Sequence, residues 1–294
     1  MTVNTYSTLD RVRAMLSLAS ADTADDSQIL SFLHNAARTI DRYTRRHYFP
    51  KDEIRYYDHH YDKKIILDAD LVQLKGLSSV NGACGFALTV VNPAAGWNWN
   101  ITPYDHIVVN ASTGSTLNYS GTPERADHVS GVWCYHEDWN NAWLDTGTSL
   151  LTTMTSNASL VVLAGAGSKG TDASDILYQH PRISVGDILK IGEEYFHVLG
   201  GDGTGNTSAL VRGAANGSAS ANHTSGTSIA KFVPQPDIEY ATRRLAAWSY
   251  KAQELPAPTR MAFPALGAVE IPTAWPEEVK AIVDRYRRLK IRTI

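Results

Sequence analysis

Apolar residues recur at helical spacing in a long stretch near the start of the chain, which we place between Asp22 and Pro50. The apolar positions in it are Ile29, Leu33, Ala36, Ile40 and Tyr43. Steps of three and four residues predict one stripe along an amphipathic helix of about six turns. Acidic residues at its start and Arg45, Arg46 and His47 at its end complement the helix dipole, and proline blocks continuation.

Three further stretches show the same periodicity. A short helix is predicted after Ser7, where Ser7 and Asp10 resemble a capping box. A third helix is predicted from Pro236 to about Glu254, and a fourth from Pro276, because proline suits a first helical turn. The chain therefore opens and closes with helical pairs.

Between these pairs the pattern changes to short apolar runs separated by Gly, Pro, Asn and Ser clusters, which is typical of strands and turns. The expected strands are residues 53–58, 64–68, 87–91, 106–110, 115–120, 129–135, 159–165, 187–191, 193–199, 208–213 and 227–232. A hairpin turn is predicted at residues 191–194.

Each amphipathic helix must bury its stripe, so the economical fold packs the first and last helices together. We therefore predict an α+β protein: a discontinuous helical bundle with a large inserted antiparallel β region, sandwich or barrel-like. The helical domain is expected from residues 1–80 and 233–294, and the β region from 81–232, with 81–143 and 144–232 as candidate subdomains.

Composition and charge argue against several classes of partner and location. With 27 basic and 30 acidic residues in 294, a net charge of −3 gives no overall attraction for nucleic acid or an anionic membrane. No apolar run approaches the length of a membrane span, and the N-terminal pattern is not that of a signal peptide. Cys84 and Cys134 are expected to be buried, reduced thiols.

No motif predicts catalysis, a metal or a cofactor. Neighbouring His59 and His60 would point to opposite faces of a strand, so a polar hairpin tip explains residues 58–62 better than a metal site. The glycine pattern at 165–170 lacks a following helix, and the glycine-rich turn at 200–205 occurs once. Without a nucleophile elbow or a distinct carboxylate pair, we expect no enzymatic activity, and a glycosidase ranks last.

Aromatic residues concentrate in the β region, where core packing is the first explanation. Trp97 and Trp99, in the loop-like sequence GWNWN, are the exceptions that could stack on a sugar or on a partner protein. An alternative function is therefore a β-rich module that binds carbohydrate or a partner protein.

The two ends of the chain resemble the head-tail adaptor (connector) proteins of tailed bacteriophages. The matching residues are Tyr6-Ser7-Thr8-Leu9, Ile40-Asp41-Arg42-Tyr43, residues 46–50, residues 275–279 and Tyr286-Arg287-Arg288. The middle is similar to β insertions of phage structural proteins at residues 129–135, 185–194 and 211–227. In the last of these, an extra Ala at 214–215 interrupts the phage pattern V-x-R-G-x-N-G-T.

This resemblance implies a virion protein of the neck, made in the host cytoplasm, with about a dozen copies in a ring. Its implied partners are the portal protein, a tail-side stopper or tail terminator, and DNA passing without sequence specificity. The implied portal-docking segment carries Arg285, Arg287, Arg288, Lys290 and Arg292. For contacts between neighbouring subunits, we predict polar helix residues, namely Arg38, Asp41, Arg42 and Arg45.

Overall fold

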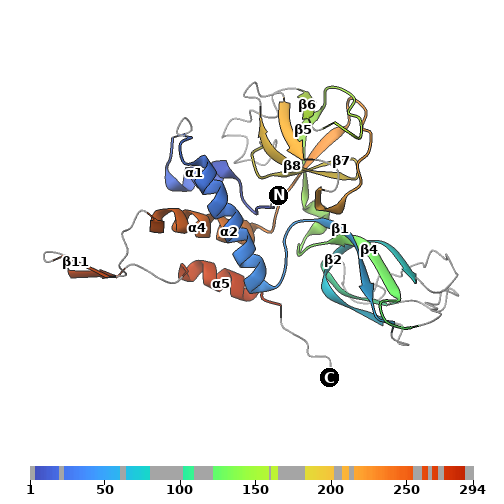
Figure 1. The fold of residues 1–294 in the computed structure, drawn as a ribbon, viewed down its shortest axis with the longest axis horizontal. Coiled ribbons are helices and arrows are strands. Elements are labelled where there is room, and N and C mark those ends of the chain that lie inside the picture. Colours follow the sequence, from blue (N-terminus) through green and yellow to red (C-terminus); the bar gives the residue numbers. More distant parts are fainter. Residues whose placement is uncertain are drawn as a thin grey trace.

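The structure is a computed structural model. It describes residues 4–19, 23–59, 64–79, 102–108, 122–158, 160–164, 183–201, 207–211, 215–253, 260–263, 267–270 and 275–288. Figure 1 shows a helical body built from both ends of the chain, beside a four-stranded sheet and a closed β-barrel. The predicted α+β class, with helices at both ends and β structure between them, is confirmed.

The helical body contains α1 (Leu9–Leu16), α2 (Asp26–Thr44), α4 (Pro236–Gln253) and α5 (Glu277–Arg285). The apolar stripes of these helices bury one another in a single core. Polar contacts join helices from the two ends: the Tyr250 hydroxyl donates to Asp25 at 2.6 Å, and the Tyr43 hydroxyl donates to Asp284. The predicted packing of the first helices against the last is therefore confirmed.

Two details of the predicted helices are wrong. The long helix ends at Thr44 rather than near Pro50, because Arg45 adopts a left-handed conformation (φ 58°, ψ 34°) and Tyr48 and Phe49 turn into the core. The N-cap of α1 is Thr8, whose hydroxyl accepts from the Arg11 amide. Ser7 instead donates to Glu239 of α4 at 2.6 Å, so it joins two helices rather than capping one.

The four-stranded sheet contains β1 (Lys51–Tyr57), β2 (Lys64–Ser79), β3 (Tyr104–Val108) and β4 (Asp127–Trp133), in the antiparallel order β1-β4-β2-β3. Its inner face buries Trp133 among aliphatic side chains, which confirms a core role for this tryptophan. Strands β1 and β2, which we grouped with the helices, pair within this sheet. The expected strands at 87–91 and 115–120 lie outside the described residues.

The barrel closes in the order β10-β5-β6-β9-β8-β7. Its strands are β5 (Trp143–Leu150), β6 (Leu160–Ala164), β7 (Ile188–Ile191), β8 (Glu194–Gly201), β9 (Thr207–Val211) and β10 (Ser228–Phe232). The predicted hairpin is confirmed: Ile191 pairs with Glu194, and Gly192 supplies the positive φ of 60° that the turn needs. Strand β5 was not predicted.

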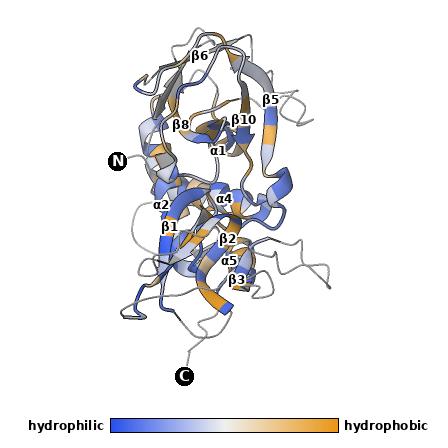
Figure 2. Cartoon of the chain, turned by 90° about the vertical axis from the view of Figure 1, so that its right-hand side faces the viewer, coloured by the Kyte–Doolittle hydropathy of each residue, from blue (hydrophilic) through white to orange (hydrophobic). Residues whose placement is uncertain are grey.

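The N-terminal segment and one short 3₁₀ turn connect the bodies. Asn4 donates to Asn216 at 2.8 Å, and the Thr5 hydroxyl donates to the carbonyl oxygen of Gly186 in the barrel. The 3₁₀ turn η4 (Ala215–Gly217) lies against β1, where a Cβ on Gly217 would come within 1.8 Å of the Asp52 carbonyl oxygen. Only glycine allows this approach. Figure 2 shows the barrel at one end of the molecule and β2, β3 and α5 toward the other.

Two further points complete the fold. A separate two-stranded hairpin, β11 (Arg260–Phe263) with β12 (Gly267–Glu270), lies between α4 and α5, where the sequence predicted no strand. Cys134 is fully buried and unbridged, whereas Cys84 lies outside the described residues. The domain limits given above stay a prediction.

Candidate functional site

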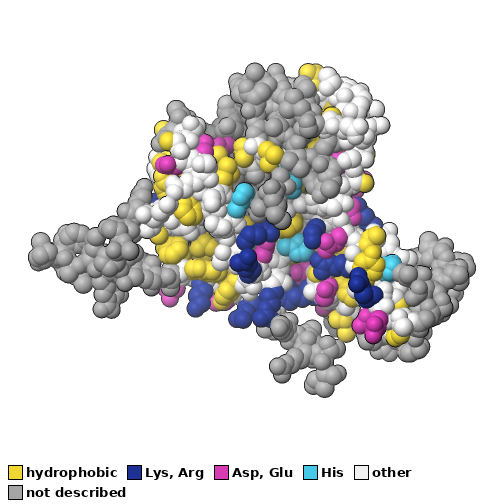
Figure 3. Space-filling model, viewed as in Figure 1, with side chains coloured by type: hydrophobic (Ala, Val, Ile, Leu, Met, Phe, Trp, Pro, Cys, Tyr) yellow, Lys and Arg dark blue, Asp and Glu magenta, His cyan; other side chains and the backbone are white. Residues whose placement is uncertain are grey.

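The ends of α2 and α5 meet at one place on the surface. The Arg288 amide donates to the carbonyl oxygen of Thr44 at 2.8 Å, and the Arg46 Nε donates to that of Tyr286 at 2.8 Å. We call this place the arginine end; its cations are Arg42, Arg45, Arg46, Arg285, Arg287 and Arg288. Figure 3 shows Lys and Arg side chains gathered along the margin of the helical body near α5.

The two inner arginines of the arginine end share one acid within the chain. Asp70, on β2, accepts from Arg46, and an Arg288 guanidinium nitrogen lies 3.6 Å from the same carboxylate. Burial raises the pKa of the Asp70 carboxyl, and the two guanidinium groups oppose that shift. Arg288 also donates to the Leu67 carbonyl oxygen at 2.8 Å. These two arginines therefore fasten the helical body to the sheet.

A group of three tyrosines supports this inner part. Tyr48, Tyr135 and Tyr286 pack edge to face, with ring centroids 5.5 to 6.1 Å apart. The Arg46 guanidinium lies 4.4 Å from the centre of the Tyr135 ring, a cation–π contact. Burial raises the pKa of Tyr286 to about 12, so its hydroxyl stays protonated and donates to Asp237.

The outer part faces solvent. Arg285 lies 3.2 Å from Asp237, and Arg287 lies over the Tyr43 ring at 5.5 Å. Arg42 and Arg45 are both exposed, and no ion pair or hydrogen bond joins either side chain to another described residue. These two side chains are available to an outside partner.

Two of the four residues predicted at a subunit interface are engaged inside the chain. Arg38 lies 3.1 Å from Asp41 and donates to the Asn4 carbonyl oxygen at 2.9 Å. The Tyr6 hydroxyl donates to Asp41 at 2.5 Å. Burial raises the pKa of Asp41 to about 6, against the opposing effects of Arg38 and the Tyr6 hydroxyl. The network holds the N-terminal segment on α2. The interface role stays a prediction for all four residues.

Other predicted positions lie outside the described residues. These are Lys290, Arg292, Trp97 and Trp99. The described part of the predicted docking segment is Arg285 to Arg288, which the contacts above fix to the body.

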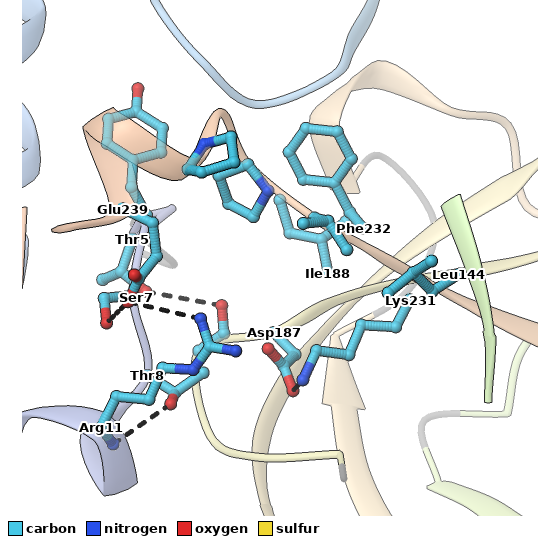
Figure 4. Close-up of a pocket in the computed structure, with 15 residues that line it drawn as sticks. Thr5, Ser7, Thr8, Arg11, Leu144, Asp187, Ile188, Lys231, Phe232 and Glu239 are labelled. Carbon is cyan, nitrogen blue, oxygen red and sulfur yellow. Dashed lines mark hydrogen bonds and ion pairs between the residues drawn. The ribbon is translucent and has the colours of Figure 1, made fainter. Parts of the chain in front are cut away.

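A cavity of about 80 Å³ lies where the N-terminal segment, the barrel and the start of α4 meet (Figure 4). Its charged side chains neutralise one another: Arg11 pairs with Glu239 at 3.4 Å and Lys231 with Asp187 at 3.1 Å. Small-molecule pockets commonly measure ~300–1,000 Å³, so this space suits a few water molecules rather than a metabolite. It belongs to the packing between the bodies.

The motifs considered in the sequence analysis form no metal or catalytic site among the described residues. The His59 side chain is 8% exposed and lies beside Asp127, with Nδ1 3.1 Å from the carboxylate. Asp58 accepts from the Arg125 amide at 2.8 Å, and residues 60–62 of the motif lie outside the described ranges. Among the residues described, no group of three or more His, Cys, Asp or Glu is placed to hold a metal ion. None of the described helices has the length and apolar character of a membrane span.

Sequence reasoning missed Asp70, the acid that organises the arginine end. It lies in the sequence Asp68-Ala69-Asp70-Leu71 within a strand that is otherwise apolar near its centre. A buried carboxylate needs a charged partner, so an acid in that setting was a usable signal. The sequence could not name the partner, because Arg288 is 218 positions away by residue number.

No protein-family model matches the chain, and no curated protein matches it. A chain in a solved structure described as "Neck of empty GTA particle computed with C6 symmetry" is similar at 14% identity and a TM-score of 0.41. The match covers 100% of this chain and 98% of the other. A TM-score of this size does not establish a shared fold.

Proposed function

We propose that this chain is a non-enzymatic structural protein of a tailed-phage virion, a head-tail adaptor of the neck. Copies form a ring that joins the portal to the tail-side proteins and surrounds part of the DNA channel. The resemblance at both ends of the sequence supports this proposal, as does a helical body closed by its first and last helices.

The observation that carries the proposal is how residues 286–288, which follow α5, are held on the helical body. Two backbone contacts, to Thr44 and from Arg46, fix residues 286–288 at the arginine end, beside exposed Arg285 and Arg287. A segment anchored at its base loses less conformational entropy when it docks than a free tail does. Arginine also suits bidentate binding of carboxylates or phosphates on the portal side.

The primary test is imaging of purified virions. Density for this chain in a ring at the neck is the expected result, and its presence at any other position would contradict the proposal. A class average of the protein bound to the portal protein of the same phage would give the copy number.

Truncation tests the docking segment. Removal of residues 289–294 leaves every contact described above in place, so the variant should keep its fold and its thermal midpoint while losing retention on portal particles. Replacement of Lys290 and Arg292 by Gln is the matched control, because it preserves length and removes charge. If the truncated chain binds the portal as well as the wild type does, the predicted docking role of this segment is wrong.

A further inference from the structure

The hairpin of β11 and β12 has a sequence that a hairpin surrounded by water would not need. Arg260 and Glu270 stand at its two ends, and residues 261–269 between them carry no polar side chain. A strand with one face in water usually alternates polar and apolar residues, whereas a continuous apolar run is typical of strands that are covered on both faces. The composition of this hairpin therefore indicates that another structure covers it.

No such covering structure belongs to the described part of the chain. Strands β11 and β12 pair with each other and with no other described strand. Figure 1 shows the hairpin apart from α4 and α5, the helices that precede and follow it in the sequence. An isolated two-stranded hairpin is marginally stable in water. The hairpin therefore has the properties of a segment that a second molecule completes.

The two outer edges of the hairpin select the kind of molecule. Each strand of a two-stranded sheet uses one edge for its partner, so β11 and β12 each leave one edge open, and these edges lie on opposite sides of the hairpin. A foreign strand added to one edge would leave the other open. A closed row of identical hairpins covers both edges, as a barrel does. The pair of open edges thus favours further copies of this chain.

Strand direction agrees with such a row. Copies related by rotation about a ring axis point their hairpins the same way, and β11 and β12 run antiparallel. Strand β12 of one copy is therefore antiparallel to β11 of the next copy, as it is to β11 of its own chain. The ladder of backbone hydrogen bonds can continue from copy to copy, and this head-to-tail contact closes when the rotation closes.

The charges at the ends of the two strands also fit this order. Arg260 pairs in register with Glu270, so the β11 edge carries a cation and the β12 edge an anion at the same end of the hairpin. Repetition in the same register places Glu270 of one copy beside Arg260 of the next, and opposite charges directly across two strands are favourable. Pairing of two β11 edges in this register, or of two β12 edges, would bring like charges together instead. The charges thus favour the head-to-tail arrangement.

The residue sizes are compatible with the same register. Phe263 pairs with Gly267, and the small residues Ala262 and Ala268 pair on the other face of the hairpin. In a continued sheet, Gly267 of one copy lies beside Phe263 of the next. The largest residue of the hairpin then has glycine as its cross-strand neighbour on both sides, which leaves room for its ring.

We propose that β12 of each copy pairs with β11 of the next copy, so that the hairpins of one ring form a continuous, closed antiparallel sheet. This inference rests on the proposed function, because it takes the copies to be related by rotation. It adds a subunit contact that is separate from the four helix residues predicted above.

Cross-linking between two different chains gives the decisive test. Both full-length chains carry Cys84→Ser, and Cys134 is buried; one chain also carries Ala262→Cys and the other Ala268→Cys. These positions face each other within one hairpin, but neither chain has both cysteines, so a 262–268 disulfide can form only between copies. After assembly of an equal mixture with the portal protein and mild oxidation, peptide mass spectrometry should find 262–268 links predominating over 262–262 and 268–268 links.

Matched controls accompany this mixture. A mixture of chains with Lys251→Cys and Glu124→Cys, at exposed positions elsewhere, should give no predominant link under the same conditions. The parent chain with Cys84→Ser alone should give no link. Links of equal abundance in all mixtures would show random collision and would overturn the inference.

Two sets of variants test the contribution of the hairpin to assembly. Replacement of residues 260–270 by a Gly/Ser segment of equal length should leave the thermal midpoint unchanged, since β11 and β12 pair with no other described strand. Sedimentation with the portal protein should show self-association at least about tenfold weaker, because the edge hydrogen bonds are lost. Arg260→Glu and Glu270→Arg should each weaken assembly, and the double variant should restore it, because opposite charges then alternate again.

Several outcomes would overturn the inference. Predominant 262–262 or 268–268 links, normal assembly of the Gly/Ser variant, or a wild type that stays monomeric alone and with the portal would each do so. Neck density for a ring that assembles without the hairpin would reject this contact and leave the adaptor proposal standing. Rings with 262–268 links at another position in the virion would reject the adaptor proposal and leave the contact standing.

Discussion

The arginine end has an inner and an outer half that use the same residue type for different purposes. In the inner half, Arg46 and Arg288 share the buried carboxylate of Asp70 and so hold the segments that follow α2 and α5 on strand β2. In the outer half, Arg42 and Arg45 are exposed and unpaired within the described structure. The comparison teaches that a cluster of basic residues must be divided by its buried acids before any of it is assigned to a partner.

Among the substitutions that test the two halves, loss of Asp70 should lower the free energy of unfolding most. Asp70→Ala leaves two arginines beside buried tyrosines without a counter-charge, so we expect the free energy of unfolding to fall by about 3 kcal/mol. Chemical denaturation at pH 7 measures it. Asp70→Asn is the matched control, since it retains hydrogen bonding and should cost less. A loss below about 1 kcal/mol for the alanine variant would mean that the inner half is not a structural ion-pair group.

The pH dependence of stability tests Asp41. Its folded pKa is about 6, above the ordinary 3.8, so the folded chain binds the extra proton between these values. The contribution of Asp41 to stability should therefore be greatest below about pH 4 and fall as the pH rises through 6. The shift corresponds to about 3 kcal/mol if taken in full, and we expect about 2 kcal/mol because the side chain is partly exposed.

Asp41→Asn supplies the control for that titration. The asparagine cannot ionise, so the difference in unfolding free energy between wild type and variant should change across pH 4 to 6 and stay level above it. A difference that is constant over this range would show that Asp41 titrates normally.

Arg45→Gly tests how much the left-handed backbone conformation at position 45 costs in stability. Relief of the left-handed conformation should raise the free energy of unfolding by up to about 1 kcal/mol, partly offset by the greater freedom of glycine in the unfolded chain. Thermal unfolding measures the change. Arg45→Ala is the comparison, because alanine keeps the strain; equal stability of the two variants would contradict a strained cap.

The smallest effect is expected for Arg42. An exposed arginine with no described partner contributes little to folding, so Arg42→Ala should change stability by less than about 0.5 kcal/mol. Denaturant titration checks this value. A larger loss would place Arg42 with the inner half, and the outer surface would then consist of Arg45 alone.

Periodicity alone predicted much of the fold. The stripes of α2, α4 and α5 gave their existence and approximate limits, and the hairpin between β7 and β8 followed from its glycine turn. The local sequence pattern was insufficient to predict helix ends and caps that depend on residues far away in the sequence. Helix α2 ends at Thr44, before the predicted end, because Tyr48 and Phe49 are buried in the core beyond it. Ser7 does not cap α1, because its hydroxyl donates to Glu239 of α4 instead.

The sequence by itself determined which segments are helical, that the two ends of the chain need each other, and that arginines gather at helix ends. These properties depend on spacing, which is local. Only the tertiary structure decided which arginines have an acid partner, because Asp70 reaches Arg46 and Arg288 through folding alone. The physical reason is that charge is compensated through space: a carboxylate acts over a few ångströms, whatever its distance along the chain.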